Sequence, residues 1–273
     1  MPLNATLHID TALKNGKTIL QKSYCTQPFK LANITEDRIQ KELQLMLMSS
    51  SPGILDGDHH AMTITVGEGC CLSVETQSYQ RIFQMQKGAS QQVHVNMQRG
   101  SSFTYLPHPL VPHRDSIFRV KNKVMLDEGC SLLWGEVISC GRKLNGEVFA
   151  FSSYHGMTEI FQKNKLVVKE NLLLRPREIA LKGIGQLEGF THQATLLYLD
   201  EKAAIPALTD ALRDTLNEDG GLTLGVSALP VNGLVIRLLG NQAEKLFAQL
   251  KTIAFLLQTQ KNMSSKTLEQ NVV

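Results

Sequence analysis

Three short segments of the chain repeat one pattern: a strand, a tight turn with a central glycine, and a second strand. The turn glycines are Gly69, Gly100 and Gly129, separated by 31 and 29 residues. Glycine suits a turn that requires a positive φ angle. A repeat of about 30 residues made only of strands is typical of stacked coils, so we predict a mainly β chain folded as a β-solenoid or superhelix-like stack of strands. A β-sandwich whose hairpins resemble one another is the plainer alternative.

Apolar and polar residues alternate along several segments of the first two-thirds of the chain, for example residues 62–66 and 93–97. This period of two is the signature of a strand with one buried face. The last third changes character and predicts a β-α-β-β-α order. Its expected elements are a strand at 195–199, a helix from Pro206, strands at 222–229 and 234–239, and a helix lined by Leu246, Leu250, Ile253 and Leu257.

Composition excludes several classes of protein. A net charge of +3 over 273 residues is too weak to indicate nucleic-acid binding. No apolar run is long enough to span a membrane, and the N-terminus does not resemble a signal peptide, so we expect a cytoplasmic chain. The five cysteines include no CxxC pair, which favours free thiols over disulfides.

The segment 49–60 (SSSPGILDGDHH) concentrates groups that can bind a metal ion. Asp56, Asp58, His59 and His60 supply two carboxylates and two imidazoles, and both kinds of group suit nickel(II). Adjacent residues on a strand point to opposite faces, so His59 and His60 are not expected to chelate one ion. A turn exposed to water is the simpler interpretation of this segment.

The segment 104–115 (TYLPHPLVPHRD) contains three prolines and two histidines. Proline removes a hydrogen-bond donor from the sheet, so the segment is expected at an edge or in a rigid connection. His108 and His113 lie five residues apart, which is not a zinc-binding spacing. A stiff loop that shapes an interaction surface is the favoured interpretation.

The segment 132–140 (LLWGEVISC) is apolar on both faces and predicts a strand buried on both sides. Glu136 is then a carboxylate inside an apolar strand, and a buried charge requires a partner, a metal ion or water. An ion pair with Arg142 or Arg81 is one interpretation. A residue that lines a polar passage is the other.

Other polar residues give weaker signals. Ser78 and Tyr79 follow the first repeat and can form a hydrogen-bonded cluster, whereas Glu147 and Glu170 are interpreted as surface carboxylates. The chain contains no G-x-S-x-G elbow, no dinucleotide-binding fingerprint and no P-loop. Catalysis therefore has no positive support in the sequence.

Six segments together resemble the UreD (UreH) family of urease accessory proteins, and they occur in the order found in that family. They are 26–31 (TQPFKL), 51–58 (SPGILDGD), 76–82 (TQSYQRI), 105–112 (YLPHPLVP), 135–142 (GEVISCGR) and 188–192 (EGFTH). The resemblance extends from about residue 7 to residue 257. The histidines at 108 and 113 depart from the aromatic residues that some relatives carry there.

The resemblance implies a non-enzymatic scaffold with a β-superhelix and two C-terminal helices. It implies direct binding to UreF, contact with the GTPase UreG through UreF, docking on apo-urease, and a complex dimerised through UreF. Nickel(II) would pass transiently through an internal tunnel, with no tightly bound cofactor. Asp58 and Glu136 are the first candidates for lining that path, Ser78 and Tyr79 are the next, and His59 and His60 are the last.

We expect one UreD-like domain over residues 1–257, with a β-superhelix to about residue 194, an α+β part at 195–257 and a flexible tail at 258–273. Two other functions stay open. A purely structural adaptor would have no nickel contact and a dry interior. A lyase or hydrolase built on a β-solenoid, such as a carbohydrate-active enzyme, would require a groove with paired carboxylates.

Overall fold

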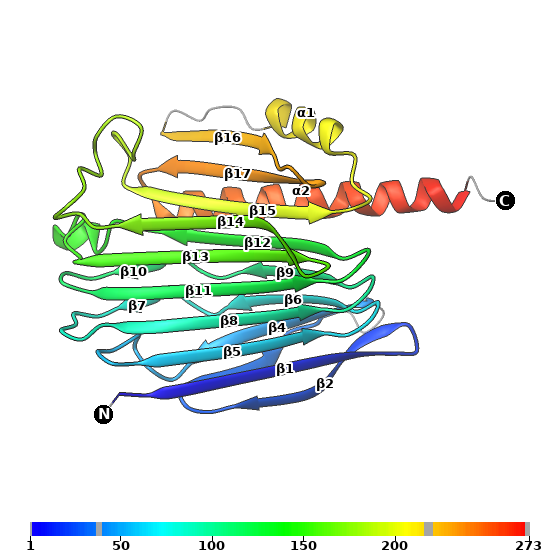
Figure 1. Cartoon of the computed structure of the whole chain (residues 1–273), viewed down its shortest axis with the longest axis horizontal. Helices are drawn as coiled ribbons and strands as arrows, with labels where there is room; N and C mark the ends of the chain where they lie inside the picture. Colours follow the sequence, from blue (N-terminus) through cyan, green and yellow to red (C-terminus); the bar gives the residue numbers. More distant parts are fainter. Residues whose placement is uncertain (1, 37–39, 216–220, 271–273) are drawn as a thin grey trace.

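The computed structural model describes residues 2–36, 40–215 and 221–270. It confirms a mainly β chain and contains two sheets and two helices (Figure 1). The seven-stranded sheet contains β1 (Asn4–Lys14), β2 (Lys17–Cys25), β5 (His59–Val66), β8 (Ala89–Met97), β11 (Ile117–Leu126), β13 (Ser153–Gln162) and β14 (Lys165–Leu174).

The second sheet has ten strands. Its main path contains β3 (Phe29–Asn33), β4 (Glu42–Ser49), β6 (Cys71–Thr76), β9 (Ser102–Leu106), β12 (Ser131–Ile138), β15 (His192–Asp200), β16 (Leu222–Ala228) and β17 (Gly233–Gly240). The short strands β7 (Gln80–Ile82) and β10 (Leu110–Pro112) pair beside this path, and the 3-10 turn η1 (Lys143–Asn145) follows β12.

The three repeated segments are the corners where the chain crosses from the seven-stranded to the ten-stranded sheet. Each joins the end of one strand to the start of the next, as β5 to β6, β8 to β9 and β11 to β12. The glycines at these corners, Gly69, Gly100 and Gly129, have φ angles of 66°, 67° and 69°, as the sequence predicted. The Gly69 and Gly100 N–H groups donate to the carbonyls of Arg99 and Glu128, so successive corners lie on one another.

Because the chain crosses repeatedly from one sheet to the other, neighbouring strands within each stack run parallel. In the seven-stranded sheet β1, β5, β8, β11 and β13 pair in parallel, and in the other sheet β4, β6, β9 and β12 do the same. Inward-facing apolar residues of both sheets form a common core, which includes Ile64, Val95 and Val124 from one sheet and Leu72, Phe103 and Leu132 from the other. The space between the sheets is therefore the interior of the molecule.

The C-terminal part has the predicted β-α-β-β-α order. Helix α1 (Ile205–Thr215) follows β15, and helix α2 (Ala243–Gln270) follows β17. Leu208, Leu212, Leu246, Leu250 and Ile253 pack from these helices against β12, β15 and β17 on the face of the ten-stranded sheet that points away from the other sheet (Figure 1). This layer buries the second apolar face that the sequence assigns to the segment 132–140.

Gly135 lets helix α2 approach β12 closely. A Cβ atom at this position would lie 2.7 Å from Leu250 Cδ2 and 2.6 Å from Leu106 Cδ2. Helix α2 continues through Gln270, over most of the segment from residue 258 where the sequence predicted a flexible tail. Residues 271–273 of that tail lie outside the described residues, and its flexibility stays a prediction.

All five cysteines carry free thiols, as expected from their number and spacing. Cys70, Cys130 and Cys140 are buried, and Cys25 is exposed. None of the helices in the described part of the chain combines the length and apolar character needed to cross a membrane.

Candidate functional site

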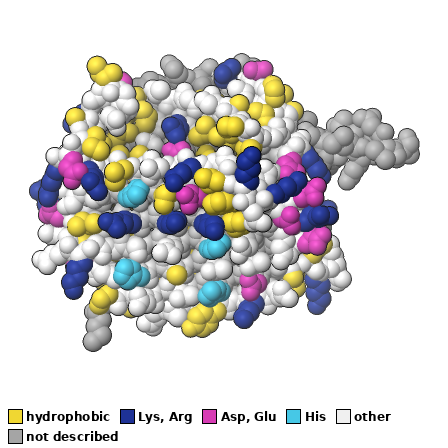
Figure 2. All heavy atoms as spheres, viewed as in Figure 1, with side chains coloured by type: hydrophobic (Ala, Val, Ile, Leu, Met, Phe, Trp, Pro, Cys, Tyr) yellow, Lys and Arg dark blue, Asp and Glu magenta, His cyan; other side chains and the backbone are white. Residues whose placement is uncertain are grey.

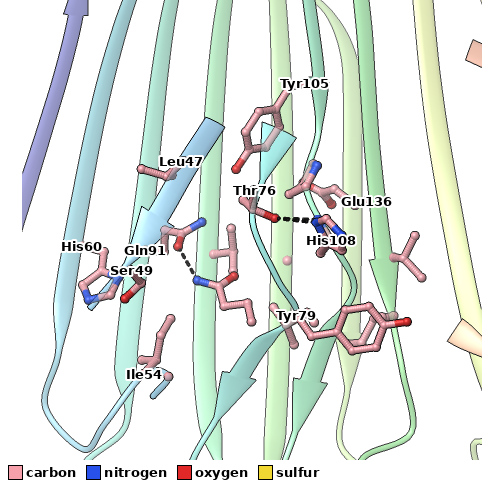
Figure 3. A pocket seen from close by; sticks show the side chains of 18 of the residues that line it. Leu47, Ser49, Ile54, His60, Thr76, Tyr79, Gln91, Tyr105, His108 and Glu136 are labelled. Carbon is pink, nitrogen blue, oxygen red and sulfur yellow. Dashed lines mark hydrogen bonds between the residues drawn. The ribbon is translucent and has the colours of Figure 1, made fainter. Parts of the chain in front are cut away.

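A pocket of about 150 Å3 lies between the two sheets. It crosses the stack of strands, since its lining comes from β4, β5 and β6 on one side and from β13, β14 and β15 on the other. Because a cavity of about 10–15 Å3 suffices for one water molecule, the pocket can hold several. Four of the six residues predicted from the sequence line it, namely His60, Ser78, Tyr79 and Glu136. Figure 3 labels three of them, His60, Tyr79 and Glu136.

Glu136 lies on the inward face of β12, with Leu132 and Trp134 on the same face. Its Oε1 atom accepts hydrogen bonds from Asn122 Nδ2 at 2.6 Å, Trp134 Nε1 at 2.9 Å and Thr158 Oγ1 at 3.4 Å. Burial raises the pKa of the Glu136 carboxyl and the charge of Glu170 adds to the rise, whereas these three donors oppose it. The second carboxylate oxygen of Glu136 accepts no hydrogen bond from the described residues, so it can meet water or a cation in the pocket.

The predicted ion pair between Glu136 and an arginine is wrong. Arg142 forks onto Glu147, with Nε to Oε2 at 2.9 Å and NH2 to Oε1 at 2.5 Å. Glu147 is itself buried rather than a surface carboxylate, and its pKa is lowered chiefly by the hydrogen bond from Arg142. The donors to Glu136 are uncharged, so its negative charge is not cancelled by a neighbouring cation.

His60 lies at the other side of the pocket, on the inward face of β5 (Figure 3). It is 5% exposed, and neither ring nitrogen has a hydrogen-bond partner among the described residues. Burial lowers the pKa of His60, which keeps the imidazole neutral, while the charge of Asp58 opposes this effect. A neutral imidazole, with a lone pair available on one ring nitrogen, is the form that binds a transition metal.

Asp58 and His59 do not line the pocket. Asp58 is buried, and its two oxygens accept hydrogen bonds from the backbone N–H groups of Leu3 and Leu55, each at 2.9 Å. Its Oδ2 atom is also 4.0 Å from His60 Nε2. His59 points to the outer face of the sheet, where Nδ1 lies 2.8 Å from Ser90 Oγ. The expectation that His59 and His60 point to opposite faces is confirmed.

Polar side chains connect the His60 side of the pocket with the Glu136 side. Gln91 lies beside His60 in the parallel register of β5 and β8, and its Oε1 accepts a hydrogen bond from Gln80 Nε2 at 2.9 Å. Thr76 Oγ1 lies 3.2 Å from His108 Nδ1 in the part of the pocket nearer Glu136 (Figure 3). These groups give the pocket hydrogen-bonding partners for water along its length.

Ser78 and Tyr79 line the same pocket at its exposed side. Ser78 is exposed, and Tyr79 is half-buried with its ring centroid 6.0 Å from that of His108. Burial raises the pKa of Tyr79, so its hydroxyl group stays protonated at neutral pH. His113 lies elsewhere, packed on the Phe83 ring at 4.9 Å, so the two histidines of the proline-rich segment do not form one site.

Glu170 is half-buried and belongs to the pocket, contrary to its interpretation as an ordinary surface carboxylate. It pairs with Thr158 in the register of β13 and β14, and its two oxygens accept bonds of 2.8 and 2.7 Å from Arg237 NH2. Thr158, which donates to Glu136, is thus the neighbour of Glu170 on the adjacent strand.

Sequence reasoning missed Gln91, Asn122 and Thr158. A signal for all three was present, because each is a polar residue at an inward position of a strand whose other inward residues are mainly apolar. Period two places Asn122 between Val120 and Val124, both buried. Polar residues at such positions indicate a wet interior.

The pocket offers spaced single ligands rather than a closed metal site. Within the described part of the chain, no cluster of three or more His, Cys, Asp or Glu side chains could hold a metal ion tightly. The pocket instead offers single ligands at separate places, one imidazole at His60 and one carboxylate at Glu136, with amides and hydroxyls between them. Spaced, weak ligands allow an ion to enter and also to leave.

Comparison with known proteins gives one consistent result. The family model described as UreD urease accessory protein matches residues 3–270. A urease accessory protein UreD from Flavobacterium johnsoniae is 44% identical over 248 residues, covering 90% of each chain. The UreD proteins of Acetivibrio thermocellus and Haemophilus influenzae (strain PittGG) are each 34% identical, covering 92% and 94% of this chain and 96% and 100% of their own.

The match extends over nearly the whole chain and is not confined to the six short motifs. Proteins of this family are maturation factors rather than enzymes, which sets aside the alternative of a carbohydrate-active enzyme. The chain belongs to the UreD urease accessory protein family and takes part in urease maturation.

Proposed function

We propose that this chain is a scaffold that binds UreF directly and apo-urease, and that nickel(II) passes through its inter-sheet pocket on the way to the urease active site. UreG would be reached through UreF, in a complex dimerised through UreF. The observation that carries the proposal is a polar pocket inside the molecule with an uncompensated carboxylate at Glu136. Nickel is the cargo in this proposal, and no tightly bound cofactor is needed.

The ligands along the pocket support a transient role. Glu136 offers a carboxylate oxygen, and His60 offers an unpartnered nitrogen. Ser78 and Tyr79 add hydroxyl groups at the exposed side. Asp58 would act indirectly, because its carboxylate already accepts two backbone hydrogen bonds and faces the His60 ring from 4.0 Å. His59 points to the outer face, so nothing in its position supports a role inside the pocket.

The arrangement of the strands also supports a path through the interior. Strands that alternate between two sheets with parallel pairing are consistent with a β-superhelix over about residues 1–194, continued by the α+β part at 195–257 in a single domain. A superhelix of this kind leaves a continuous interior between its two sheets. The proposal also keeps the cytoplasmic location expected from the sequence.

The test combines association with activation. Wild-type chain and the Glu136→Gln variant are each co-expressed with the host's UreF and analysed by size exclusion, and the purified complexes are then used with UreG, GTP and nickel to activate apo-urease. We expect both chains to bind UreF and the variant to give less active urease. Glu68→Gln, an exposed carboxylate at a corner outside the pocket, is the matched control.

Two results would count against the proposal. Full activation by the Glu136→Gln complex would favour the alternative of a purely structural adaptor without nickel contact. Failure of the wild-type chain to associate with folded UreF would remove the scaffold role itself.

A further inference from the structure

The outer face of the seven-stranded sheet carries a row of positive side chains. Arg119, Lys121 and Lys123 occupy three successive outward positions of β11, and we call these three residues the β11 stripe. Alternate residues of a strand are about 6.6 Å apart along its axis, so the three charges form a line. Figure 2 shows Lys and Arg side chains in a row across the middle of this face, with His side chains above and below it.

The stripe is only partly neutralised by its surroundings. Glu159 on β13 lies 4.0 Å from Lys121, but its other oxygen is 3.2 Å from Lys169 on β14, so two lysines share one carboxylate. Lys123 Nζ lies 5.1 Å from the centre of the Phe161 ring. Arg119 has no ion-pair partner among the described residues.

On the β8 side, the positions beside the stripe carry groups that are neutral or can gain a proton. In the register of the sheet, Arg119 lies between Ser90 on β8 and His155 on β13, and Lys123 lies between His94 on β8 and Glu159 on β13. No carboxylate stands on the outward positions of β8, where Ser90, Gln92 and His94 follow one another. The positive potential therefore reaches over β8 without an acidic side chain to cancel it.

Protection of a sheet edge does not explain these charges. Proteins place lysines on edge strands to prevent pairing with other chains, but β11 is the third strand of seven and is paired on both sides. Like charges about 7 Å apart repel each other at low ionic strength. A row of cations on a central strand is thus unfavourable in the isolated chain and becomes favourable when an acidic partner covers it.

We infer that the β11 stripe is a docking surface for an acidic patch on the protein surface of apo-urease. This inference rests on the proposed function, in which the chain docks on apo-urease. A protein partner fits better than a nucleic acid, because three cations on one strand and a net charge of +3 give too few phosphate contacts for a stable complex. A flat sheet face with a short line of charges matches the size of a polar patch within a protein interface.

The test uses the chain in complex with UreF. Arg119→Glu, Lys121→Glu and Lys123→Glu are combined, and the affinity of the complex for purified apo-urease is measured at several salt concentrations. The matched control reverses three exposed lysines in loops outside both sheets: Lys87→Glu, Lys182→Glu and Lys202→Glu. If the triple glutamate variant does not fold, the neutral combination Arg119→Gln, Lys121→Gln and Lys123→Gln is used in its place.

We expect the stripe variant to bind apo-urease about tenfold or more weakly at low salt and to lose much of the salt dependence, while the control keeps both. Retention of UreF binding and of the far-UV circular dichroism spectrum shows that the variant is folded. Unchanged affinity of the folded stripe variant, with wild-type binding intact, would overturn this inference and leave the proposed function standing.

Two further outcomes also decide the matter. Absence of any wild-type binding to apo-urease would overturn the inference together with the docking role from which it starts. Equally strong binding of the wild-type complex to a 30-base-pair DNA duplex or to phosphatidylglycerol vesicles, lost in the stripe variant, would show a general anion-binding face and overturn the assignment to urease.

Discussion

Asn122 on β11 donates a 2.6 Å hydrogen bond to Glu136 on β12 and thereby joins the two sheets across the interior. The Asn122 side chain is buried, and its Nδ2 atom also donates to Thr158 Oγ1 at 2.8 Å. The amide thus holds the carboxylate in one orientation without neutralising it. A lysine or arginine at this place would instead form a tight ion pair and neutralise the carboxylate.

Glu136 is expected to reduce stability at neutral pH. Its pKa is raised in the folded chain, so the folded state binds the proton more tightly than the unfolded state, and this contribution is lost as the pH rises through the folded pKa. We predict that Glu136→Gln melts at a higher temperature than wild type at pH 7 to 8, with a smaller difference near pH 4.5. Thermal melts of both proteins at these pH values provide the measurement. A Gln variant that melts lower at every pH would show that the ionised carboxylate contributes net stability.

His60, like Glu136, is expected to reduce the stability of the fold. An unsatisfied buried polar group costs about 1–3 kcal/mol, and both ring nitrogens of His60 are unpartnered. We predict that His60→Leu unfolds at an equal or higher temperature than wild type but lowers nickel-dependent urease activation. Ile64→Leu, a buried change four residues along the same face of β5 and outside the pocket lining, is the control and should leave activation unaltered. Normal activation by the folded His60→Leu chain would remove His60 from the nickel path.

His192 makes the chain sensitive to acid. Burial, aided by the charge of Lys143, lowers the pKa of His192 to about 4, below its value in the unfolded chain. The unfolded state therefore binds the proton first, and stability is lost as the pH falls from about 6.5 toward 4. The loss amounts to about 2 kcal/mol at pH 5 if the unfolded pKa is about 6.5.

Replacement of His192 tests this linkage. His192→Gln should lose less stability than wild type between pH 7 and pH 5, as measured by urea unfolding at both pH values. The exposed His94→Gln change is the control and should leave the difference between the two pH values as it is in wild type. An unchanged pH dependence in His192→Gln would assign the acid sensitivity to other groups.

A buried and an exposed arginine–glutamate pair should differ in their contribution to stability. Glu147 is 6% exposed and is held by two bonds from Arg142, whereas the Arg99–Glu128 pair, at 3.2 Å, has both side chains more than half exposed. Without Arg142, the buried Glu147 carboxylate is left with the more distant Arg114, whose Nε lies 3.9 Å from Oε1, whereas exposed pairs contribute little. Thermal melts should therefore show a drop of several degrees for Arg142→Gln and almost none for Arg99→Gln. Equal effects of the two changes would contradict this ranking.

The sequence predicted much of the framework because local rules determine it. Turn glycines with positive φ, the alternation along β5 and β8, and the β-α-β-β-α order of the last third depend on residues close together in the chain. The same alternation correctly separated His59 from His60. The apolar character of both faces of the segment 132–140 likewise predicted the strand on which Glu136 lies.

The partners of Glu136 could not be predicted in this way. Asn122 and Thr158 lie 14 and 22 residues from it and reach it only because β11 and β13 stack over β12 across the interior. Arg142 is close to Glu136 in sequence, but its side chain lies beyond the end of β12 and donates to Glu147 instead. Nearness in sequence therefore suggested the wrong partner, since contacts between sheets depend on which strands face each other.

Inward and outward side chains alternate along β11, and the two faces of this strand carry different polar groups. Even-numbered positions place Asn122 beside the Glu136 carboxylate, and odd-numbered positions place Lys121 and Lys123 outside. A slip of one residue in strand pairing would exchange the two faces, so that an ammonium group would enter the interior in place of the amide. Such a misfolded chain would place a positive charge beside the Glu136 carboxylate, and it would also expose apolar Val120 and Val124. Correct registration of this single strand during folding thus decides whether the Glu136 carboxylate meets a neutral amide or a lysine.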